Sequence, residues 1–460
     1  MSTTMIICIT TAIVILATIV PTYVISHRET TSADSWAAAD RSLPIYVVIG
    51  TQFASVVGGG VLVGHVGSAY TNGVAHLIYV VLVCSPLLVY MILAKWIRAH
   101  NFSTIPEMLG SFTNNNKTIR VIAAIMTIIV PFGWITSQIT AFGSIYSGLT
   151  GLDYNMLCII FAAVSLLFLM PAGLKTVAWT DFIFACFMLI MMFVCMFYAG
   201  DMRGDIALNP ELISFGASVD RIGWATIILW IFAILPGGVT NQLYFQRICA
   251  IKEEKEVNRS LILSFIVCLV GVGWAVYMGI VMNAVNPDIT DGAVTGWFIS
   301  QLPVPVLALF AALIFAAMMS TLDSGAQSVV VNITRDVIPT ITGKEMDPKK
   351  ELLVSRCLSV AIIVIALVMC LKFTDTLGWQ TATYAYSAAA LFVPMYVAYA
   401  LRNKNFVTSW GIGASMIGGV VGAAIAAILD TAINYAAAGI GLSLICLLVV
   451  SALTKKKNAA

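Results

Sequence analysis

Charge is what this sequence has least of. Only 10% of its 460 residues are charged and the net charge is +2, whereas about 25% of the residues of an average soluble domain carry a charge. Such a composition gives no indication of a nucleic-acid-binding surface. Hydrophobic residues make up 60% of the chain, and its mean hydropathy is +0.97. The sequence therefore predicts an all-α protein that crosses a membrane many times.

The short motifs of enzymes and motors are also missing. The sequence contains no GxxxxGK[ST], HExxH or GxSxG pattern, so we expect neither an ATP-driven pump nor an enzyme. Its ten cysteines lie within or beside apolar runs, which predicts neither a disulfide framework nor a zinc site. The first apolar run lacks the basic residues and the cleavage site of a signal peptide, so we expect it to be a true span. No segment indicates an obligatory protein partner.

Apolar runs of about 20 residues, the length that crosses the hydrocarbon core of a bilayer, recur along the whole chain. Membrane lipid is therefore an expected neighbour on all sides. The runs predict thirteen transmembrane helices, at about residues 5–26, 44–70, 74–98, 119–148, 153–171, 177–199, 221–246, 258–283, 303–337, 351–371, 377–401, 408–428 and 431–453.

The basic residues predict how the chain lies in the membrane. With the N-terminus outside, all but three of the 24 lysines and arginines fall on one side of the predicted spans, and the exceptions are Arg203, Arg221 and Lys372. Cytoplasmic loops are the ones that carry such an excess. We therefore expect an external N-terminus and a cytoplasmic C-terminus in the cell membrane, whether that is an inner or a plasma membrane.

Two predicted spans contain residues that interrupt helices. A glycine triplet at 58–60 lies in the middle of the second span, and Pro-Gly-Gly at 236–238 lies at a similar depth in the seventh. Inside a helix, glycine costs roughly 1 kcal/mol and proline about 3 kcal/mol relative to alanine. Small residues also allow helices to pack closely. However, the two breaks are five spans apart, and broken helices at matching positions of inverted repeats indicate the central site of a transporter.

A third polar feature lies in the ninth span, which reads FAAMMSTLDSGAQS from residue 315 to residue 328. Ser320, Thr321, Asp323 and Ser324 place hydroxyls and a carboxylate in a membrane helix, where a carboxylate costs ~2.5 to 3.5 kcal/mol on insertion scales. Ala317 shares a helical face with Ser320 and Ser324. These hydroxyls either bind a ligand or bond to carbonyls of their own helix, as hydroxyls in membrane helices often do.

At four places the sequence resembles the sodium:solute symporters, a family that includes carriers of sugar, proline, pantothenate, sialic acid and choline. The matching segments, in the order of the family, are FASVVGGGVLVGHVGSAYTNG, AGLKTVAWTD, NQLYFQRICA and AAMMSTLDS with NITRD. The resemblance implies the LeuT-type fold and sodium-coupled uptake of a small organic metabolite by alternating access. It divides the single transporter domain, 1–460, into an extra N-terminal helix (1–43), two five-helix repeats (44–200 and 201–405) and two C-terminal helices (406–460).

The resemblance also implies the sodium ligands. Sodium is a hard cation that needs several oxygens, and only a broken membrane helix offers free carbonyls. Carried over by position, the ligands are the carbonyl oxygens of Ala54, Val57 and Ala317 and the hydroxyl oxygens of Ser320 and Thr321.

Similarity to some sialic acid carriers implies a second sodium, held by Asp181, Ser320, Asp323 and Ser324. Asp323 departs from those carriers, which have a serine there. As alternatives, Asp181 is a solvated residue at a helix end, and Asp323 is a partner of Arg335 or of a backbone amide.

The substrate cavity is expected at the two breaks and on the spans that face them. The residues expected to line it are Gly58, Gly59, Gly60, Val61, Tyr79, Trp134, Gln138, Asn241, Gln242 and Tyr244. Tyr79 is alternatively a core or interface residue. The glycine triplet and QLYFQR resemble the choline branch, whose tryptophan cage holds a cation, but this chain keeps only Trp134 and has Val56 and Asn241 where that cage has tryptophans. We therefore expect a small polar or zwitterionic solute.

A different function on the same fold stays open at this point. The alternative to a symporter is a sodium-leak channel or a solute sensor that does not transport. Neither would accumulate a solute in response to a sodium gradient.

Overall fold

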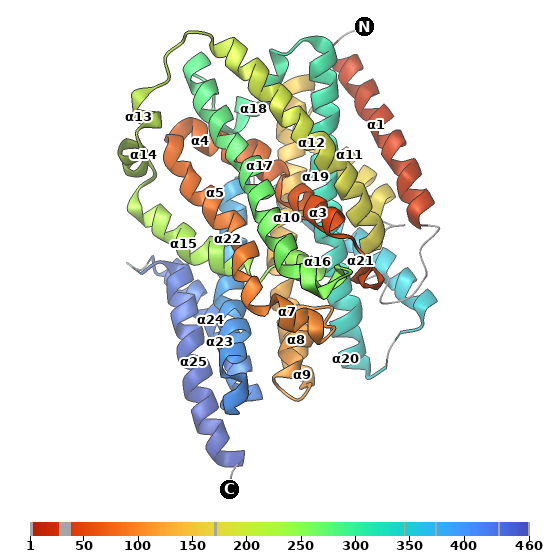
Figure 1. The fold of residues 1–460 in the computed structure, drawn as a ribbon, viewed down its shortest axis with the longest axis vertical. Coiled ribbons are helices and arrows are strands. Elements are labelled where there is room, and N and C mark those ends of the chain that lie inside the picture. The colour runs from red at the N-terminus through yellow and green to blue at the C-terminus, as the bar shows by residue number, and fades with distance from the viewer. Residues whose placement is uncertain are drawn as a thin grey trace.

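A computed structural model describes residues 3–26, 38–169, 173–344, 346–372, 375–430 and 433–458. These residues form helices joined by short connections, and within the described ranges the only β-pairing is an isolated bridge between Leu43 and Ile251. Figure 1 shows the two ends of the chain at opposite ends of the long axis. The predicted all-α fold is confirmed.

The α-helices of the described ranges have the following bounds: α1 (Thr3–Ser26), α3 (Ile45–Val56), α4 (Val66–Asn72), α5 (Leu77–Cys84), α6 (Pro86–Val89), α7 (Met91–Ala99), α8 (Ile105–Ser111), α9 (Lys117–Thr127), α10 (Ile129–Thr150), α11 (Tyr154–Leu169), α12 (Leu174–Arg203), α13 (Pro210–Ile213), α14 (Phe215–Ile222), α15 (Trp224–Gly238), α16 (Gln242–Ala250), α17 (Val257–Val285), α18 (Val294–Ser300), α19 (Val304–Asn332), α20 (Ile338–Thr342), α21 (Pro348–Cys370), α22 (Thr376–Ser387), α23 (Val393–Leu401), α24 (Ser409–Ile428) and α25 (Tyr435–Asn458).

Ten helical stretches in the described ranges are long and apolar enough to cross a membrane, and three shorter apolar helices accompany them. One of the short helices, Ile45–Val56, is the first half of the second predicted span. The second half continues into the stretch 60–99 and turns at Gly73, whose φ of +79° favours glycine. The count of thirteen spans stays a prediction.

The first broken helix comprises α3 and α4. α3 ends at Val56, and Val57 leaves the helical conformation with φ −88° and ψ 79°. The chain becomes helical again at Gly60–His65, a π-helical turn called η2, which leads into α4. The predicted break in the second span is therefore confirmed.

This break takes two backbone oxygens out of the helical hydrogen-bond pattern. In an unbroken helix the N–H of Gly58 would bond to the carbonyl of Ala54, but it donates to Val56 at 3.2 Å. Similarly, the N–H of Val61 donates to Gly58 at 3.0 Å and not to Val57. The carbonyls of Ala54 and Val57 are thus free to accept other ligands.

The second broken helix comprises α15 and α16. α15 continues through Pro236, which removes one backbone donor without ending the helix. The break lies at residues 239–241, after the predicted position 236–238. Asn241 is extended there, and its side chain caps α16 by accepting the N–H of Leu243 at 3.0 Å. The seventh span is broken as predicted, but by the cap at Asn241 and not by the proline.

The two glycines of Pro-Gly-Gly have a packing role. A Cβ atom on Gly237 would lie 2.3 Å from the carbonyl oxygen of Tyr384 in α22, and one on Gly238 would lie 2.3 Å from the ring of Pro86. Both distances are too short for any side chain. Close helix packing, the alternative considered for this motif, therefore applies to these two positions.

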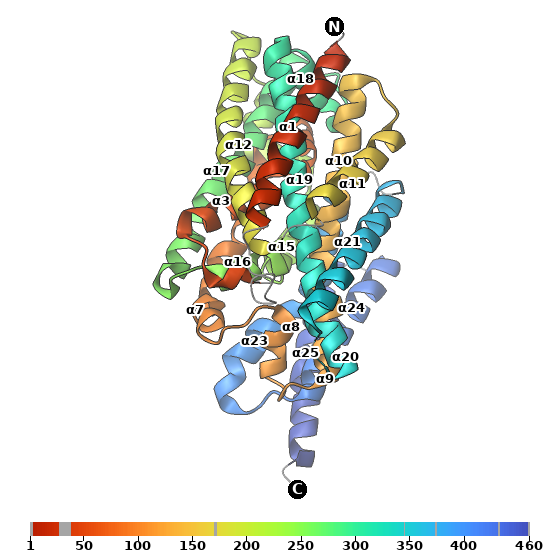
Figure 2. The same ribbon diagram turned by 90° about the vertical axis from the view of Figure 1, so that its right-hand side faces the viewer.

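α19 lies at the centre of the molecule. Every residue from Phe310 to Asn332 is buried, and α1, α10 and α12 pack around this helix. Figure 2 shows α1 crossing in front of α19, with α12 beside them. Because α19 is enclosed by protein, its polar side chains are shielded from lipid, as polar groups in membrane helices usually are.

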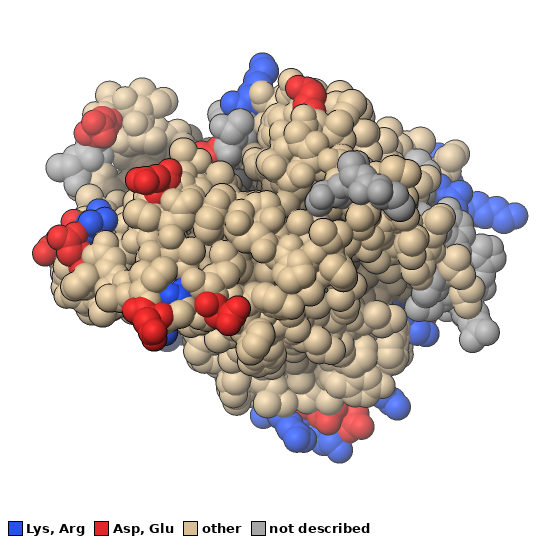
Figure 3. Space-filling view, turned by 90° about the horizontal axis from the view of Figure 1, so that it is seen from above, with Lys and Arg blue, Asp and Glu red and all other residues tan. Residues whose placement is uncertain are grey.

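Beyond the break, α4 borders an open vestibule with a volume of about 380 Å³. Its walls include Ser68 and Asn72 of α4 and the carboxylates Asp291 and Asp375. Figure 3 shows the molecule from above. Most of this face is uncharged, and its charged side chains lie mainly toward the edge.

The chain before α3 closes the other end of the broken helix. The N–H of Leu43 donates to the carbonyl of Ala250 at 3.0 Å, and the N–H of Lys252 donates to the carbonyl of Leu43 at 2.9 Å. The guanidinium of Arg41 donates to the carbonyl of Cys249 at 3.4 Å. We call residues 41–43 and 249–252 the backbone seal. The molecule is thus open beside α4 and closed before α3.

Candidate functional site

Thr321 brings predicted sodium ligands of two helices together. Its hydroxyl oxygen lies 3.2 Å from the carbonyl oxygen of Ala54 in α3 and 3.2 Å from that of Ala317 in α19. A Cβ atom on Gly58 would lie 2.5 Å from the same hydroxyl, so only glycine lets the break approach this closely. The bond to Ala317 lies within α19, as the alternative holds, but the hydroxyl also faces the freed oxygen of the broken helix.

Ser320 makes a different contact. Its hydroxyl donates to the carboxylate of Asp181 in α12 and not to its own helix. The same carboxylate accepts the hydroxyls of Thr51 at 2.5 Å and Ser324 at 3.1 Å. Asp181 is only 1% exposed, so the alternative that it is a solvated helix-end residue is wrong.

A buried arginine completes this group. Arg247 of α16 is fully buried, and its Nη2 lies 2.7 Å from the hydroxyl of Ser324 and 3.6 Å from the carboxylate of Asp181. It also lies 3.2 Å from the hydroxyls of Thr51 and Ser55. By its place in the sequence Arg247 is expected among the basic residues of a cytoplasmic loop, but its side chain lies inside the protein. We call Thr51, Asp181, Arg247 and Ser324 the arginine cluster.

Of the residues predicted for a second sodium, the structure brings three together: Asp181, Ser320 and Ser324. The guanidinium of Arg247 lies among them. Within the described part of the chain Asp323 makes no hydrogen bond to these three residues, and its buried Oδ1 has no hydrogen-bond partner.

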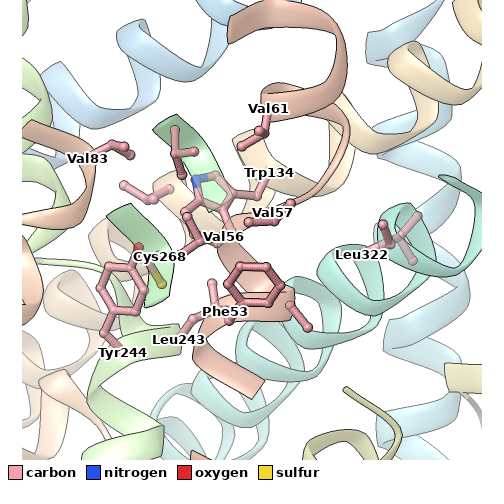
Figure 4. Close-up of a cluster of buried hydrophobic side chains, with 14 of the residues drawn as sticks. Phe53, Val56, Val57, Val61, Val83, Trp134, Leu243, Tyr244, Cys268 and Leu322 are labelled. Carbon is pink, nitrogen blue, oxygen red and sulfur yellow. The ribbon is translucent and has the colours of Figure 1, made fainter. Parts of the chain in front are cut away.

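A small cavity lies between the break and α10. Its volume is about 20 Å³, which leaves room for roughly one water molecule. The residues that line it are Ser55, Val56, Gly60, Val61, His65, Val83, Trp134, Gln138, Thr321, Gln380 and Tyr384. Figure 4 shows the apolar side of this region, with Val56 and Val57 beside the Trp134 ring.

The polar side chains of the cavity bond to one another or to groups directly beside it. Gln138 accepts the N–H of Gly59 at 2.6 Å, and the indole N–H of Trp134 donates to the hydroxyl of Tyr384 at 3.0 Å. Gln380 donates to the hydroxyl of Ser137 at 2.8 Å. A substrate larger than water can enter only if these groups exchange their partners and move apart.

Four predicted substrate residues line the cavity, namely Gly60, Val61, Trp134 and Gln138. Gly58 and Gly59 are adjacent to it, because a Cβ atom on either would lie within 3.3 Å of the Gln138 amide oxygen.

The other four are not brought to the cavity. Gln242 accepts the N–H of Ile105 at 3.0 Å and donates to the carbonyl of Ser103, and Asn241 caps α16. Tyr244 packs edge-on against Trp134 with ring centroids 6.1 Å apart. Tyr79 stacks on His76 in the core, which is the alternative considered for it.

Several residues that line the cavity have no feature in the sequence that predicts this position. Gln380 and Tyr384 come from α22, a predicted span with no break or repeated motif to mark them. His65 and Val83 lie within apolar runs. The motif NQLYFQR contains Arg247, but nothing in its spacing indicates that this side chain turns inward.

Comparisons with known proteins agree with this geometry. A family model described as the sodium:solute symporter family matches residues 36–422. The high-affinity proline transporter PutP of Bacillus subtilis (strain 168) is 24% identical, over 90% of this chain and 89% of that protein. The osmoregulated proline transporter OpuE of the same strain is 22% identical, over 95% and 92%. A sodium/proline symporter of Staphylococcus aureus is 24% identical, over 86% and 81%.

Two solved structures share the fold. The substrate-bound outward-open state of a Na⁺-coupled sialic acid symporter superposes with a TM-score of 0.81, at 15% identity and with 97% of each chain covered. Mhp1, a nucleobase-cation-symport-1 family transporter in a closed conformation with bromovinylhydantoin bound, gives a TM-score of 0.59 at 13% identity, with 92% of this chain and 94% of Mhp1 covered. The predicted LeuT-like symporter fold is confirmed. The family model spans most of the sequence, and the chain belongs to the sodium:solute symporter family.

Proposed function

We propose that this protein takes up a small zwitterionic solute together with sodium, which binds where the broken helix meets α19. Membership of the family makes the chain a sodium-coupled solute carrier that crosses the membrane several times. The observation that carries the site is the position of the Thr321 hydroxyl, 3.2 Å from the freed carbonyl of Ala54. The ligands in this proposal are the carbonyls of Ala54, Val57 and Ala317 and the hydroxyls of Ser320 and Thr321.

The lining of the cavity supports a zwitterionic substrate. Among the described residues, this lining includes no aspartate, glutamate, lysine or arginine, so it offers no strong partner to a solute that carries net charge. Amide, hydroxyl, indole and imidazole groups can bind both ends of a zwitterion, while Val56, Val61 and Val83 suit an apolar body. The curated relatives described above are proline transporters. Proline, with a carboxylate, an ammonium and an apolar ring, is the substrate that we propose to test first.

Sodium and substrate are coupled through the break. Thr321 lines the cavity and also contacts Ala54, and Gly59 bonds to Gln138 in the cavity wall. A sodium ion that fixes the freed carbonyls therefore also fixes one wall of the substrate site. Coupling of this kind is reciprocal, so each ligand raises the affinity for the other.

The arginine cluster favours a single sodium in the present arrangement. A guanidinium 3.6 Å from Asp181 places a positive charge where the second sodium would bind, and two cations close together repel. A second sodium at Asp181, Ser320, Asp323 and Ser324 then requires Arg247 to withdraw.

The proposed orientation puts the vestibule beside α4 outside the cell and the backbone seal at the cytoplasmic side. It follows from the distribution of lysine and arginine, which predicts an N-terminus outside the cell and a C-terminus in the cytoplasm. The two chain ends lie at opposite ends of the molecule (Figure 1), as this orientation requires.

Uptake of radiolabelled proline into proteoliposomes tests the proposal. We expect saturable accumulation that requires an inward sodium gradient and stops when a sodium ionophore removes it. Accumulation that is indifferent to the ionophore would contradict sodium coupling. Sodium flux without any solute would favour the leak channel, and sodium-dependent binding without flux would favour the sensor. The relatives described above are transporters, and none of them is a channel or a sensor.

A further inference from the structure

Two buried histidines lie side by side next to the cavity, and the sodium site uses neither. His65 and His76 are 2% and 0% exposed, and Nδ1 of His65 lies 3.0 Å from Nε2 of His76. Tyr79 stacks on His76 with ring centroids 5.4 Å apart, and Trp230 packs edge-on against His76 at 5.6 Å. This packing holds both imidazoles in fixed positions.

The hydrogen-bond chain continues from the histidines to the vestibule. Nδ1 of His76 lies 2.9 Å from the hydroxyl of Ser68, and the side-chain amide of Asn72 donates to that hydroxyl at 3.3 Å. Ser68 and Asn72 line the vestibule, whereas His65 lines the cavity. Four side chains thus form one continuous chain of hydrogen bonds between two hollow regions. We call Asn72, Ser68, His76 and His65 the histidine relay.

The hydroxyl of Ser68 can donate to His76 while it accepts from Asn72, which allows one direction along the whole chain of hydrogen bonds. Because Asn72 donates to Ser68, the single hydroxyl proton of Ser68 is available for Nδ1 of His76. With Ser68 as the donor, His76 carries its proton on Nε2 and donates it to Nδ1 of His65. In the same way His65 carries its proton on Nε2. Within the described residues this nitrogen makes no hydrogen bond, and its ring faces the cavity.

We propose that His65 is a substrate-binding residue whose Nε2–H donates a hydrogen bond to a carboxylate oxygen of the transported solute. His76, Ser68 and Asn72 are positioning residues, since they fix which nitrogen of His65 bears the proton. The described residues that line the cavity include no lysine or arginine, so a neutral donor of fixed direction takes the place of a cation. This inference rests on the proposed uptake of a zwitterion and adds the group that recognises its anionic end.

Nitrogen NMR of protein labelled with ¹⁵N-histidine tests the direction of the relay. The sequence has four histidines, so the spectrum is simple and His65→Gln and His76→Gln assign the two buried rings. We expect both rings to carry the proton on Nε2 in the wild-type protein. Ser68→Ala removes the donor to His76 and should mix its tautomers. A proton on Nδ1 of His65 in the wild type would overturn the proposal, because the cavity would then face an acceptor.

Ligand binding tests the carboxylate contact. Proline and prolinamide, which lacks the negative charge, are compared by thermal shift in sodium. We expect His65→Phe to weaken proline binding by roughly 10- to 100-fold, the range for losing a hydrogen bond to a charged group, and to leave prolinamide binding unchanged. His65→Gln, which keeps an N–H donor near the same place, should restore most of the proline affinity. His100→Phe is the matched control, because His100 is exposed and bonds to the carbonyl of Trp96.

Each remaining outcome decides between the two proposals. Equal losses for proline and prolinamide in His65→Phe, or no loss for proline, would overturn the role of His65 and leave the proposed uptake intact. If His65→Phe does not fold, His65→Gln alone is decisive, since proline binding abolished in that variant would also overturn it. A wild-type protein that binds neither probe would overturn the zwitterionic substrate class and the carboxylate contact together.

Discussion

At the scale of single residues, the Thr321 hydroxyl is placed to serve two ligands. It lies against the freed carbonyl of Ala54 and also lines the substrate cavity. In the structure its proton can be given to Ala54 or to Ala317. In the proposed sodium site, this oxygen turns its lone pairs toward the ion and releases the two carbonyls. The same oxygens that now share a proton would then be ligands of one cation.

Removing either hydroxyl should weaken sodium binding. For Ser320→Ala and Thr321→Ala we expect the sodium concentration at half-maximal uptake to rise by roughly 5- to 150-fold, because a buried group left short of a partner costs about 1 to 3 kcal/mol. Apparent substrate affinity should fall at limiting sodium and recover at saturating sodium. Initial uptake rates against sodium concentration measure both effects.

Ser328→Ala is the control for this pair. Its hydroxyl is buried on the same helix and, within the described ranges, bonds only to the carbonyl of Gly325 at 2.9 Å, so its loss should leave the sodium dependence unchanged. Half-saturation points that stay at the wild-type value in both Ser320→Ala and Thr321→Ala would remove the sodium site assigned here.

Arg247→Gln should destabilise the protein and make it more responsive to sodium. Breaking a buried ion pair costs about 3–5 kcal/mol, because the remaining charge is left uncompensated. Asp181 keeps its hydroxyl donors, and sodium can replace the lost guanidinium. Melting temperatures in sodium chloride and potassium chloride of equal ionic strength measure this. We expect sodium to raise the melting temperature of the variant more than that of the wild type.

The matched control breaks a different ion pair. Arg120 bonds to Asp336 at 2.8 Å and is 27% exposed, so Arg120→Gln should lower stability without any preference for sodium. An equal gain from sodium in the two variants would contradict a cation-binding role of the arginine cluster.

The single residues of the site were only partly predictable. Ser320 and Thr321 stand out because hydroxyls are rare neighbours in an apolar run, and a broken helix indicates where free carbonyls lie. Arg247 and His65 give no such signal. An arginine at the end of a membrane helix normally faces the adjoining loop. A single histidine in an apolar run shows no periodic pattern from which the direction of its ring could be predicted. Only the folded helices bring Arg247 to Asp181 and His76 to His65.

At the scale of the elements, the two broken helices differ in how they are stopped. The first stops at Val57, directly before the glycine triplet, and frees the carbonyls of Ala54 and Val57. The second continues through Pro236 and restarts at an asparagine cap, while its glycines admit the backbone of α22. Composition predicts that both helices break. It does not predict the exact residue, because a proline in a membrane helix is tolerated when neighbours satisfy the backbone.

Gly237→Leu should reduce transport and leave the protein inserted. Its Cβ would lie 2.3 Å from the Tyr384 carbonyl oxygen, so α15 and α22 must move apart, and overpacking of this kind costs typically 1–3 kcal/mol. Tyr384 lines the cavity, which carries the displacement to the substrate site. Uptake kinetics measured at equal amounts of membrane-inserted protein test this.

Gly273→Leu is the control for Gly237→Leu. Gly273 lies in α17, and a Cβ atom there would meet nothing within 4 Å, so uptake should stay near the wild-type rate. Wild-type kinetics in Gly237→Leu would show that the spacing of α15 and α22 does not matter for transport.

At the scale of the whole molecule, the distribution of basic residues predicts the orientation. Cysteines introduced between residues 201 and 220, for example Asp205→Cys, should react with a membrane-impermeant maleimide added to intact cells. Lys349→Cys should react only after the membrane is opened. The reverse pattern would contradict an external N-terminus. Cys8, Cys186 and Cys357 are exposed and are replaced by serine beforehand, and this background without added cysteines is the control.

The fold class was more predictable than the number of spans. Apolar runs of bilayer length are hard to mistake, and four motifs in one order indicate the family. The count is less certain because α3 is only half a span long and α4 turns into α5 at Gly73. Composition alone does not predict which half of a broken helix crosses the membrane.

The backbone seal has a consequence for the empty carrier. It holds one side shut with two main-chain hydrogen bonds and the contact from Arg41, and each such bond contributes a net 0.5–1.5 kcal/mol or so. To shift a protein with two conformations from a 1:99 to a 99:1 population ratio, a ligand must bind one conformation roughly 5.5 kcal/mol more tightly than the other. The combined free energy of the seal contacts is of this order or smaller, so sodium and substrate together can open the seal. In the proposed orientation the loaded carrier opens the seal to release its cargo, and the empty carrier closes it again on every return. The strength of these few carbonyl contacts therefore affects both the transport rate and the sodium leak. Stronger contacts would slow the opening of the seal and hence the cycle. Weaker contacts would let sodium cross without a solute.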